Sequence, residues 1–405
     1  MDFKNRKCYK EEDETTNSLS CLPNEIALDI LSRLPIKSVI QSRFACRSWN
    51  LLSCDPLLVH MHMSMTMIYQ RVCLIFHSKY PLRNQLHFLE FLDDDDNQIV
   101  RKFDTPFSDF TPEFSVIGSV NGLLCLIDSS LADSVYIYNP FTRDYKVIPK
   151  SIKIQDQIVM FGFGFHPITK EYKVIKIVYY PNANNLKIAR KCNGLMTSLR
   201  SDVQIYNLGT NEWSSIGETP YRLEKRSSPG VLVSGRLHWM SQLAKYTSRP
   251  GRIIVSFDLS NDSFREIPNP DSGALKWTSS HLAVLGGFLS AATHLGNGAL
   301  DIWVMKEYGV PESWVKMFTL GAYSPRIIGP ELQNGGVSLH NFLGGNSVRI
   351  LCVMKTGEIL VEYKGGTLVC YNPDTGEFKN LTFQGMPSNF QTIVHVGSLN
   401  PVVPF

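Results

Sequence analysis

The pattern of apolar residues changes along the chain. Near the front these residues recur at the interval of a helix, and over most of the remaining chain they form short continuous stretches. Near the front, apolar side chains recur every four residues, at Ile26, Ile30 and Leu34. This interval is typical of one face of an amphipathic helix. Pro23 suits the first helical position, and Pro35 cannot continue a helix. The pattern therefore predicts a helix between the two prolines.

Two shorter helices are predicted after Pro35. The first begins near Lys37 and the second stops near Asp55-Pro56. Their apolar residues are Val39, Ile40 and Phe44 in the first and Cys46, Trp49, Leu51 and Leu52 in the second. Three helices this short rarely build a self-sufficient core. We therefore expect these apolar residues either to pack on the chain behind them or to dock the helices of a partner.

Most of the remaining chain reads as short β-strands in a repeat. Four segments share an aromatic residue, a second aromatic seven positions later and an aliphatic residue three beyond that: YNPFTRDYKVI from Tyr138, YNLGTNEWSSI from Tyr206, FDLSNDSFREI from Phe257 and YNPDTGEFKNL from Tyr371. Residues that favour turns separate the aromatics, which is typical of a β-hairpin. Further hairpins are predicted from Phe91 and from Trp303 to Trp314. The same spacing occurs in FHPITKEYKVI, from Phe165, which is interpreted as the other hairpin of its unit.

A second pair of strands precedes most of these hairpins. Glycine-containing turns separate two apolar runs in IGSVNGLLCLI, GVLVSGRLHWM and LAVLGGFLSAATHL. Four short strands per unit, repeated about six times, are the signature of a β-propeller, and six or seven blades fit the spacing. Residues 390–399 are predicted to close the ring by pairing with the first blade near residues 72–91. The predicted fold class is mainly β, with a small three-helix block followed by a propeller of about six blades.

Composition and charge narrow the class of protein. A chain of 405 residues with 43% hydrophobic and 19% charged residues is ordinary for a soluble globular protein. A net charge of +3 does not suggest generic nucleic-acid binding, and no apolar run is long enough to span a bilayer. We therefore expect neither nucleic acid nor a membrane as a partner. The polar first twenty residues and the scattered cysteines favour a cytoplasmic or nuclear location, or both.

Motifs for catalysis or for metal binding are weak. We find no G-x-S-x-G, H-E-x-x-H or P-loop pattern. The segment 162–164 starts like a dinucleotide fingerprint, but Pro167 takes the place of the third glycine, so we interpret it as a strand. His60 and His62 could bind a metal on one strand face, although such a pair is more often structural. The prediction is no catalytic residue, no metal and no cofactor.

The front block resembles an F-box. LP at residue 22, ILSRLP at residue 30 and CRSWN at residue 46 follow one another with the spacing of that family, over residues 22 to about 63. The resemblance implies docking onto a Skp-type adaptor and, through it, onto a cullin scaffold. The residues on the family's motif positions, and so the predicted adaptor-binding residues, are Leu22, Pro23, Ile30, Leu34, Pro35, Val39, Cys46 and Trp49.

The repeat over residues 115–385 resembles the F-box-associated, kelch-like domain of plant F-box proteins, including S-locus types. The predicted domains are then a disordered leader at 1–19, an F-box at 20–63 and a propeller at 68–399. The resemblance implies a non-catalytic substrate-recognition subunit of a Skp–cullin–F-box ubiquitin ligase, whose propeller holds the target protein near a transferase. The alternatives are a scaffold or regulator that binds the adaptor without delivering substrates, and a propeller enzyme.

Long loops on one face of the propeller are the predicted target-binding site. Residues 181–200, 218–229 and 241–252 carry ten basic residues against Glu218 and Glu224. Arginine pairs well with carboxylate and phosphate, so an acidic or phosphorylated target is expected, unless these are simply solvated loops. The candidate residues are Lys187, Arg190, Lys191, Arg222, Lys225, Arg226, Lys245, Arg249 and Arg252, with the aromatics Tyr221 and Tyr246.

Overall fold

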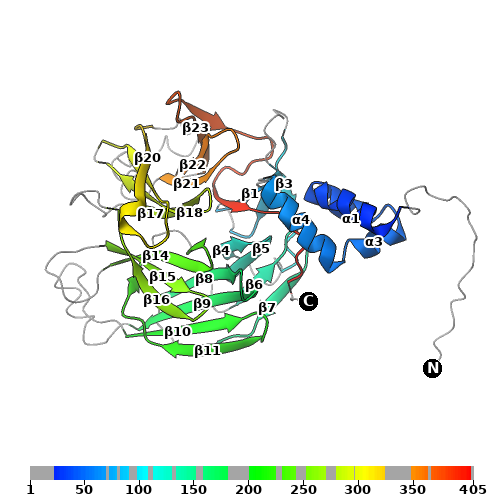
Figure 1. Ribbon diagram of the computed structural model, residues 1–405, viewed down its shortest axis with the longest axis horizontal. Coiled ribbons are helices and arrows are strands. Elements are labelled where there is room, and N and C mark those ends of the chain that lie inside the picture. Colours follow the sequence, from blue (N-terminus) through cyan, green and yellow to red (C-terminus); the bar gives the residue numbers. More distant parts are fainter. Residues whose placement is uncertain are drawn as a thin grey trace, which may run out of the picture. The chain divides into compact units, whose positions relative to one another are not determined.

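The chain divides into two units, Met1–Tyr69 and Gln70–Phe405, the first helical and the second built of strands (Figure 1). The computed structural model describes residues 22–69, 73–79, 83–90, 98–107, 113–129, 134–151, 158–180, 200–224, 230–242, 252–270, 280–295, 297–323, 348–363 and 366–402. None of the described helices is both long enough and apolar enough to cross a membrane.

Four helices make up the described part of the first unit. They are α1 (Asn24–Arg33), α2 (Ile36–Ser42), α3 (Arg47–Leu52) and α4 (Pro56–Ile68). The first lies between Pro23 and Pro35, as the sequence predicts, and each of these prolines precedes a helix. The second and third helices were also predicted, but α2 ends at Ser42, before Phe44, which the prediction had included. The fourth was not predicted, so the block has one helix more than expected.

The helix α4 corrects the interpretation of His60 and His62. Apolar and polar residues alternate from Met61 to Met67, which imitates the pattern of a strand. The segment is nevertheless helical. Asp55 Oδ1 accepts a hydrogen bond from the Leu57 backbone N–H at 2.8 Å and so caps the start of a helix. His62 is buried, with Nε2 3.1 Å from the Leu34 carbonyl oxygen, whereas His60 is exposed. Residues two apart on a helix do not face each other, so this pair cannot share a metal.

The described strands of the second unit form six antiparallel sheets. The first combines β25 (Phe390–His395) with β1 (Cys73–Ser78), β2 (Leu86–Glu90) and β3 (Arg101–Phe103). The second contains β4 (Phe114–Val120), β5 (Leu123–Asp128), β6 (Val135–Tyr138) and β7 (Tyr145–Ile148). The third contains β8 (Ile158–His166), β9 (Glu171–Tyr180), β10 (Arg200–Asn207) and β11 (Glu212–Gly217).

The remaining three sheets follow in chain order. The fourth contains β12 (Arg222–Leu223), β13 (Val231–Val233), β14 (Arg236–Gln242), β15 (Arg252–Asp258) and β16 (Ser263–Ile267), with both β12 and β13 paired to β14. The fifth contains β17 (Ser280–Leu285), β18 (Phe288–His294), β19 (Leu300–Met305) and β20 (Trp314–Leu320), with the 3₁₀ turn η3 (Pro311–Ser313) before β20. The sixth contains β21 (Val348–Val353), β22 (Ile359–Tyr363), β23 (Thr367–Tyr371) and β24 (Phe378–Leu381).

These sheets are the blades of a closed propeller. The strand β25 contacts β4, β4 contacts β8, β8 contacts β14, β13 and β14 contact β17, β17 contacts β21, and β21 returns to β25. A buried apolar cluster lies between each pair of neighbouring sheets. The propeller fold is therefore confirmed, and the described residues form six blades rather than seven.

The repeated aromatic pairs lie opposite each other across the outer hairpins. The strand partners are Tyr138 and Tyr145, Tyr206 and Trp213, Phe257 and Phe264, and Tyr371 and Phe378. Phe165 and Tyr172 are partners on β8 and β9, which is the inner hairpin of its blade, as predicted. The predicted start at Phe91 lies outside the described residues, although Leu86 on β2 does pair with Phe103 on β3.

The closing strand and the glycine turns also match the predictions. The strand β25 pairs antiparallel with β1, so that Thr392 lies opposite Phe76. Asn121-Gly122, Ser234-Gly235 and Gly286-Gly287 all have positive φ at both turn positions, the geometry of a tight two-residue hairpin.

The glycines of β8 make room for the fourth blade. A Cβ atom added to Gly162 would lie 2.6 Å from Cζ2 of Trp239, and one added to Gly164 would lie 2.6 Å from Cδ1 of Leu259. Both neighbours are buried side chains. The predicted strand is therefore correct, and close packing explains why a glycine pattern resembling a nucleotide fingerprint occurs there.

Candidate functional site

The helical unit keeps apolar side chains on its surface as well as in its core. On α1, Ala27, Leu28 and Leu31 are buried, whereas Ile26 and Ile30, one turn apart, are exposed. A unit of this size cannot enclose all its apolar residues, and exposed apolar groups gathered on one small unit indicate a contact surface for another protein.

Most of the predicted adaptor-binding residues are accessible. Pro23 and Ile30 are exposed. The half-buried members of the set are Leu22, Leu34, Pro35, Cys46 and Trp49. Val39 differs, because its side chain is fully buried in the core of the helical unit. In this conformation Val39 therefore supports the helices from within and is not available to a partner.

The most exposed apolar residues of the unit were not in the predicted set. Phe44 is 88% exposed, Leu51 is 68% exposed, and Leu57 is exposed as well. Phe44 had been assigned to the second helix, but α2 ends at Ser42 and leaves Phe44 in the turn before α3. No local pattern distinguishes exposed Leu51 from buried Leu52, so only packing identifies it.

The predicted target-binding residues of the propeller are described only in part. Those outside the described residues are Lys187, Arg190, Lys191, Lys225, Arg226, Lys245, Arg249 and Tyr246. Arg222 and Tyr221 are half-buried, and the Tyr221 ring packs 6.1 Å from the ring of Phe264, centroid to centroid.

The two glutamates of this region are both paired with arginines. Arg200 Nε lies 3.2 Å from Glu218 Oε1 in an exposed ion pair. Arg252 is only 12% exposed, and its Nε donates to Glu224 Oε1 at 2.6 Å. Arg252 also donates through Nη1 to the carbonyl of Ser280 on the next blade, at 3.3 Å. Arg252 therefore joins two blades and is not a surface contact for a target.

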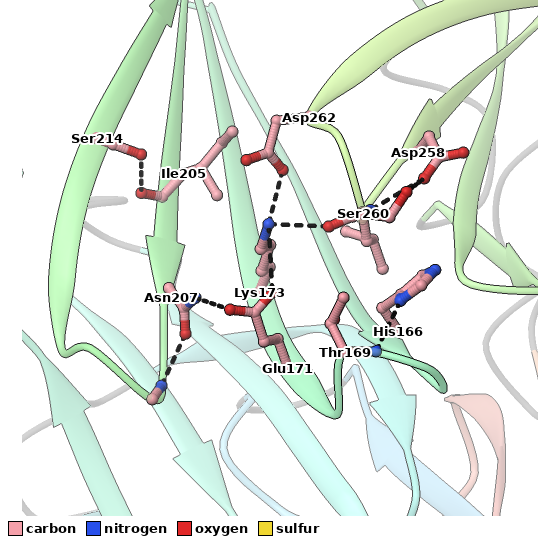
Figure 2. A network of polar contacts seen from close by, with 12 residues as sticks. His166, Thr169, Glu171, Lys173, Ile205, Asn207, Ser214, Asp258, Ser260 and Asp262 are labelled. Atoms are coloured by element: carbon pink, nitrogen blue, oxygen red, sulfur yellow. Dashed lines mark hydrogen bonds and ion pairs between the residues drawn. The ribbon is translucent and has the colours of Figure 1, made fainter.

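A buried lysine joins the third and fourth blades (Figure 2). Lys173 on β9 is 7% exposed, and its Nζ lies 2.9 Å from Asp262 Oδ1 and 3.7 Å from Glu171 Oε2. It also donates to the carbonyl of Leu259 at 2.8 Å, and Glu171 in turn accepts from Asn207 Nδ2 at 2.8 Å. The acceptors come from two blades and satisfy the ammonium group, so we interpret the network as a structural link.

Possible metal ligands and two cysteines were considered as sites of chemistry among the described side chains. Within the described ranges, no group of three or more His, Cys, Asp or Glu side chains is placed to hold a metal ion. Burial raises the pKa of the Cys352 and Cys370 thiols to about 12, so neither is a nucleophile at neutral pH. These cysteines behave as small core residues.

An accessible apolar surface on a small helical unit, with a six-bladed propeller in the same chain, defines a class of protein-interaction molecules. Residues 71–402 match the F-box associated beta propeller domain, and residues 19–64 match an F-box-like domain. The chain belongs to the plant F-box proteins that carry an F-box associated β-propeller.

Similar proteins extend over nearly the whole chain. F-box protein At3g07870 of Arabidopsis thaliana is 43% identical over 98% of this chain and 96% of its own length. F-box protein CPR1 of the same plant is 27% identical over 94% of this chain and 89% of its own length. The solved structure of an oligogalacturonate lyase from Vibrio parahaemolyticus aligns with 77% of this chain and 80% of its own chain, at 11% identity and a TM-score of 0.40. A similarity this low indicates nothing about the function of this protein.

Proposed function

We propose that this chain is the substrate-recognition subunit of a Skp–cullin–F-box ubiquitin ligase. The observation that carries the proposal is the exposed apolar surface of the F-box unit, which includes Ile26, Ile30, Phe44 and Leu51. Burying such side chains against an adaptor's helices supplies hydrophobic binding energy that the isolated unit cannot gain. The adaptor would connect the chain to a cullin scaffold.

The propeller's part in this proposal is to hold the target protein. The chain then performs no chemical step, and it accelerates ubiquitination by raising the effective concentration of the target near a transferase. The buried Lys173 network and the high pKa of the Cys352 and Cys370 thiols support a non-catalytic role.

Replacing both Leu22 and Pro23 by alanine is expected to weaken capture of a Skp-type adaptor at least about tenfold, because apolar anchors dominate such contacts. The measurement is co-purification of the full chain with the adaptor. Ile168→Ala is the matched control, since it truncates an exposed apolar residue of the propeller and should leave capture unchanged. Equal capture by the wild type and the double variant, or none by either, would contradict the proposal.

A basic face of the propeller is the proposed site for an acidic or phosphorylated target. Among its described residues, Arg200 is exposed and Arg222 is partly exposed. Changing both to glutamate is expected to stop target decay while adaptor capture continues, because like charges repel the target. The measurement is protein turnover in cells that express each variant. Unchanged turnover would refute this site, and if no protein decays faster with the wild type than with the Leu22/Pro23 variant, the scaffold alternative is favoured.

A further inference from the structure

Two Asn-Gly dipeptides lie in the described part of the propeller, at Asn121-Gly122 and at Asn297-Gly298. An asparagine before a glycine can lose its side-chain amide without an enzyme, because the glycine nitrogen can reach the side-chain carbonyl carbon and glycine has no Cβ to hinder the approach. Both dipeptides lie in turns, and both glycines have positive φ. Their surroundings differ, and the difference decides which of the two can react.

The turn at Asn297 leaves the reacting atoms accessible. It joins β18 to β19, and both Asn297 and Gly298 are exposed. A Cβ atom added to Gly298 would meet, apart from its chain neighbours and among the described residues, no atom closer than Cβ of Ala322 at 3.5 Å. The Gly298 N–H donates to the Leu295 carbonyl at 3.1 Å, and a single hydrogen bond in an exposed turn opens readily.

The side chain of Asn297 is also held in position for attack. Its Oδ1 accepts the Ala299 backbone N–H at 3.1 Å, which folds the side chain forward over the following peptide. The same N–H polarises the side-chain carbonyl and stabilises the negative charge that develops on Oδ1 when a nucleophile adds to the carbon. The local structure therefore favours attack by the Gly298 nitrogen.

The turn at Asn121 is enclosed by residues near the C-terminus. Ser398 Oγ and Asn400 Nδ2 both donate to the Asn121 backbone carbonyl, at 2.8 and 2.7 Å. The Asn121 side-chain amide donates to the Tyr172 hydroxyl at 3.2 Å, and a Cβ atom added to Gly122 would overlap the Ser398 side chain. Ring closure requires the Asn121 peptide to rotate, so several contacts must break before this site can react.

We propose that Asn297 is a site of spontaneous deamidation and isomerisation, and that Ser398 and Asn400 protect Asn121 from the same reaction. The Gly298 nitrogen forms a bond to Asn297 Cγ and gives its proton to water, and the amide nitrogen leaves as ammonia while the succinimide ring closes. Water then opens the ring at either carbonyl, which yields aspartate or isoaspartate. Each conversion replaces a neutral amide by a carboxylate.

The new charge lies at a defined place on the propeller. The β18–β19 turn joins the second and third strands of the fifth blade, as the connections β9–β10 and β14–β15 do in the third and fourth blades. Connections at the same position in each blade emerge on the same face of a propeller. Resting on the proposed function, the conversion therefore lowers the positive charge of the face proposed for the target.

Peptide mapping by mass spectrometry of the purified full chain, incubated at mildly alkaline pH, tests this inference. The Asn297 peptide is expected to convert at least about tenfold faster than the Asn121 peptide, because Asn121 reacts only after local opening. Asn297→Gln is the matched control, since attack on glutamine must close a larger ring, and its peptide should keep the amide. Asn193-Gly194 and Asn334-Gly335 lie outside the described residues and fall in separate tryptic peptides.

A second variant tests the protection of Asn121. Ser398→Ala with Asn400→Ala removes both donors to the Asn121 carbonyl and is expected to speed conversion of Asn121 about tenfold, while the rate at Asn297 stays that of the wild type. Absence of conversion at Asn297, or equal rates at Asn297 and Asn121 in the wild type, would overturn the proposal. Continued protection of Asn121 in the double variant would refute the role of Ser398 and Asn400. These readouts need neither adaptor nor target, so failure of the proposed function leaves them unchanged.

Discussion

The free energy of unfolding of the propeller is expected to fall steeply as the pH drops below about 6.5. Burial lowers the pKa of His77 and His238 to about 4 and that of His281 and His395 to about 3. The unfolded chain, with imidazole pKa values near 6.5, binds more protons than the folded chain between about pH 6.5 and 4. Stability is therefore complete above about pH 6.5 and is lost as the pH falls.

The expected size of this effect follows from linkage. Each buried imidazole contributes about 1.4 kcal/mol per pH unit inside the window, so the four together approach about 5 kcal/mol per unit. Urea unfolding at a series of pH values between about 7.5 and 5 measures the slope. A free energy of unfolding that stays constant over this range would contradict the prediction.

A single substitution can show how much of the pH dependence of the free energy of unfolding comes from His281. The Ile350 backbone N–H donates to His281 Nε2 at 3.3 Å, and the side-chain carbonyl of a glutamine can accept the same bond. We therefore expect His281→Gln to fold and to reduce the slope by about a quarter. His60→Gln is the control, because His60 is exposed on α4 of the other unit, and it should leave the slope unchanged.

Truncation after Asn389 is expected to abolish the cooperative unfolding of the propeller. It removes β25, the inner strand of the first blade, together with the buried Phe390, Leu399 and Val402. Three fully buried apolar side chains are worth about 5 kcal/mol, which is comparable to the whole stability of a typical domain. Thermal unfolding monitored by circular dichroism measures the loss, and Ile168→Ala, which truncates an exposed side chain of the propeller, is the control that should unfold like the wild type.

A pair of substitutions tests the same strand if the truncated chain aggregates. Thr392→Pro removes the backbone N–H that donates to Glu362 Oε2 at 2.6 Å, so a loss of about 2 kcal/mol is expected, as for a hydrogen bond to a charged group. Thr392→Val should be neutral or slightly stabilising, because the Thr392 hydroxyl is buried without a hydrogen-bond partner among the described residues. Equal stability of the two variants would show that the hydrogen bond from the Thr392 N–H to Glu362 does not stabilise β25.

The features that the sequence predicted well depend on neighbours in the chain. The pair Tyr371 and Phe378 is set by a short turn, and the turn at Asn121-Gly122 by two residues that tolerate positive φ. The helix α1 is bounded by prolines that act on their own backbone. Such effects extend over a few residues, so they can be read from local sequence.

The errors arose where local patterns conflict or where distant residues decide. Alternation from Met61 to Met67 imitates a strand, and the capping by Asp55 overrides it. The number of basic residues in the loops led to the prediction that Arg252 is a surface residue. In the structure, Glu224 and the next blade enclose its side chain. Phe44 and Leu51 are exposed because other apolar residues fill the core of the helical unit. The sequence pattern does not show which apolar residues these are.

The sequence by itself therefore determined the two-part architecture, the repeated hairpins and the F-box motif positions, because periodicity, turn chemistry and motif spacing are properties of adjacent residues. Only the tertiary structure decided that there are six blades, that Val39 is buried and that Arg252 joins two blades. Burial and ion pairing depend on which distant residues meet, and the free energy of packing the whole chain selects those contacts.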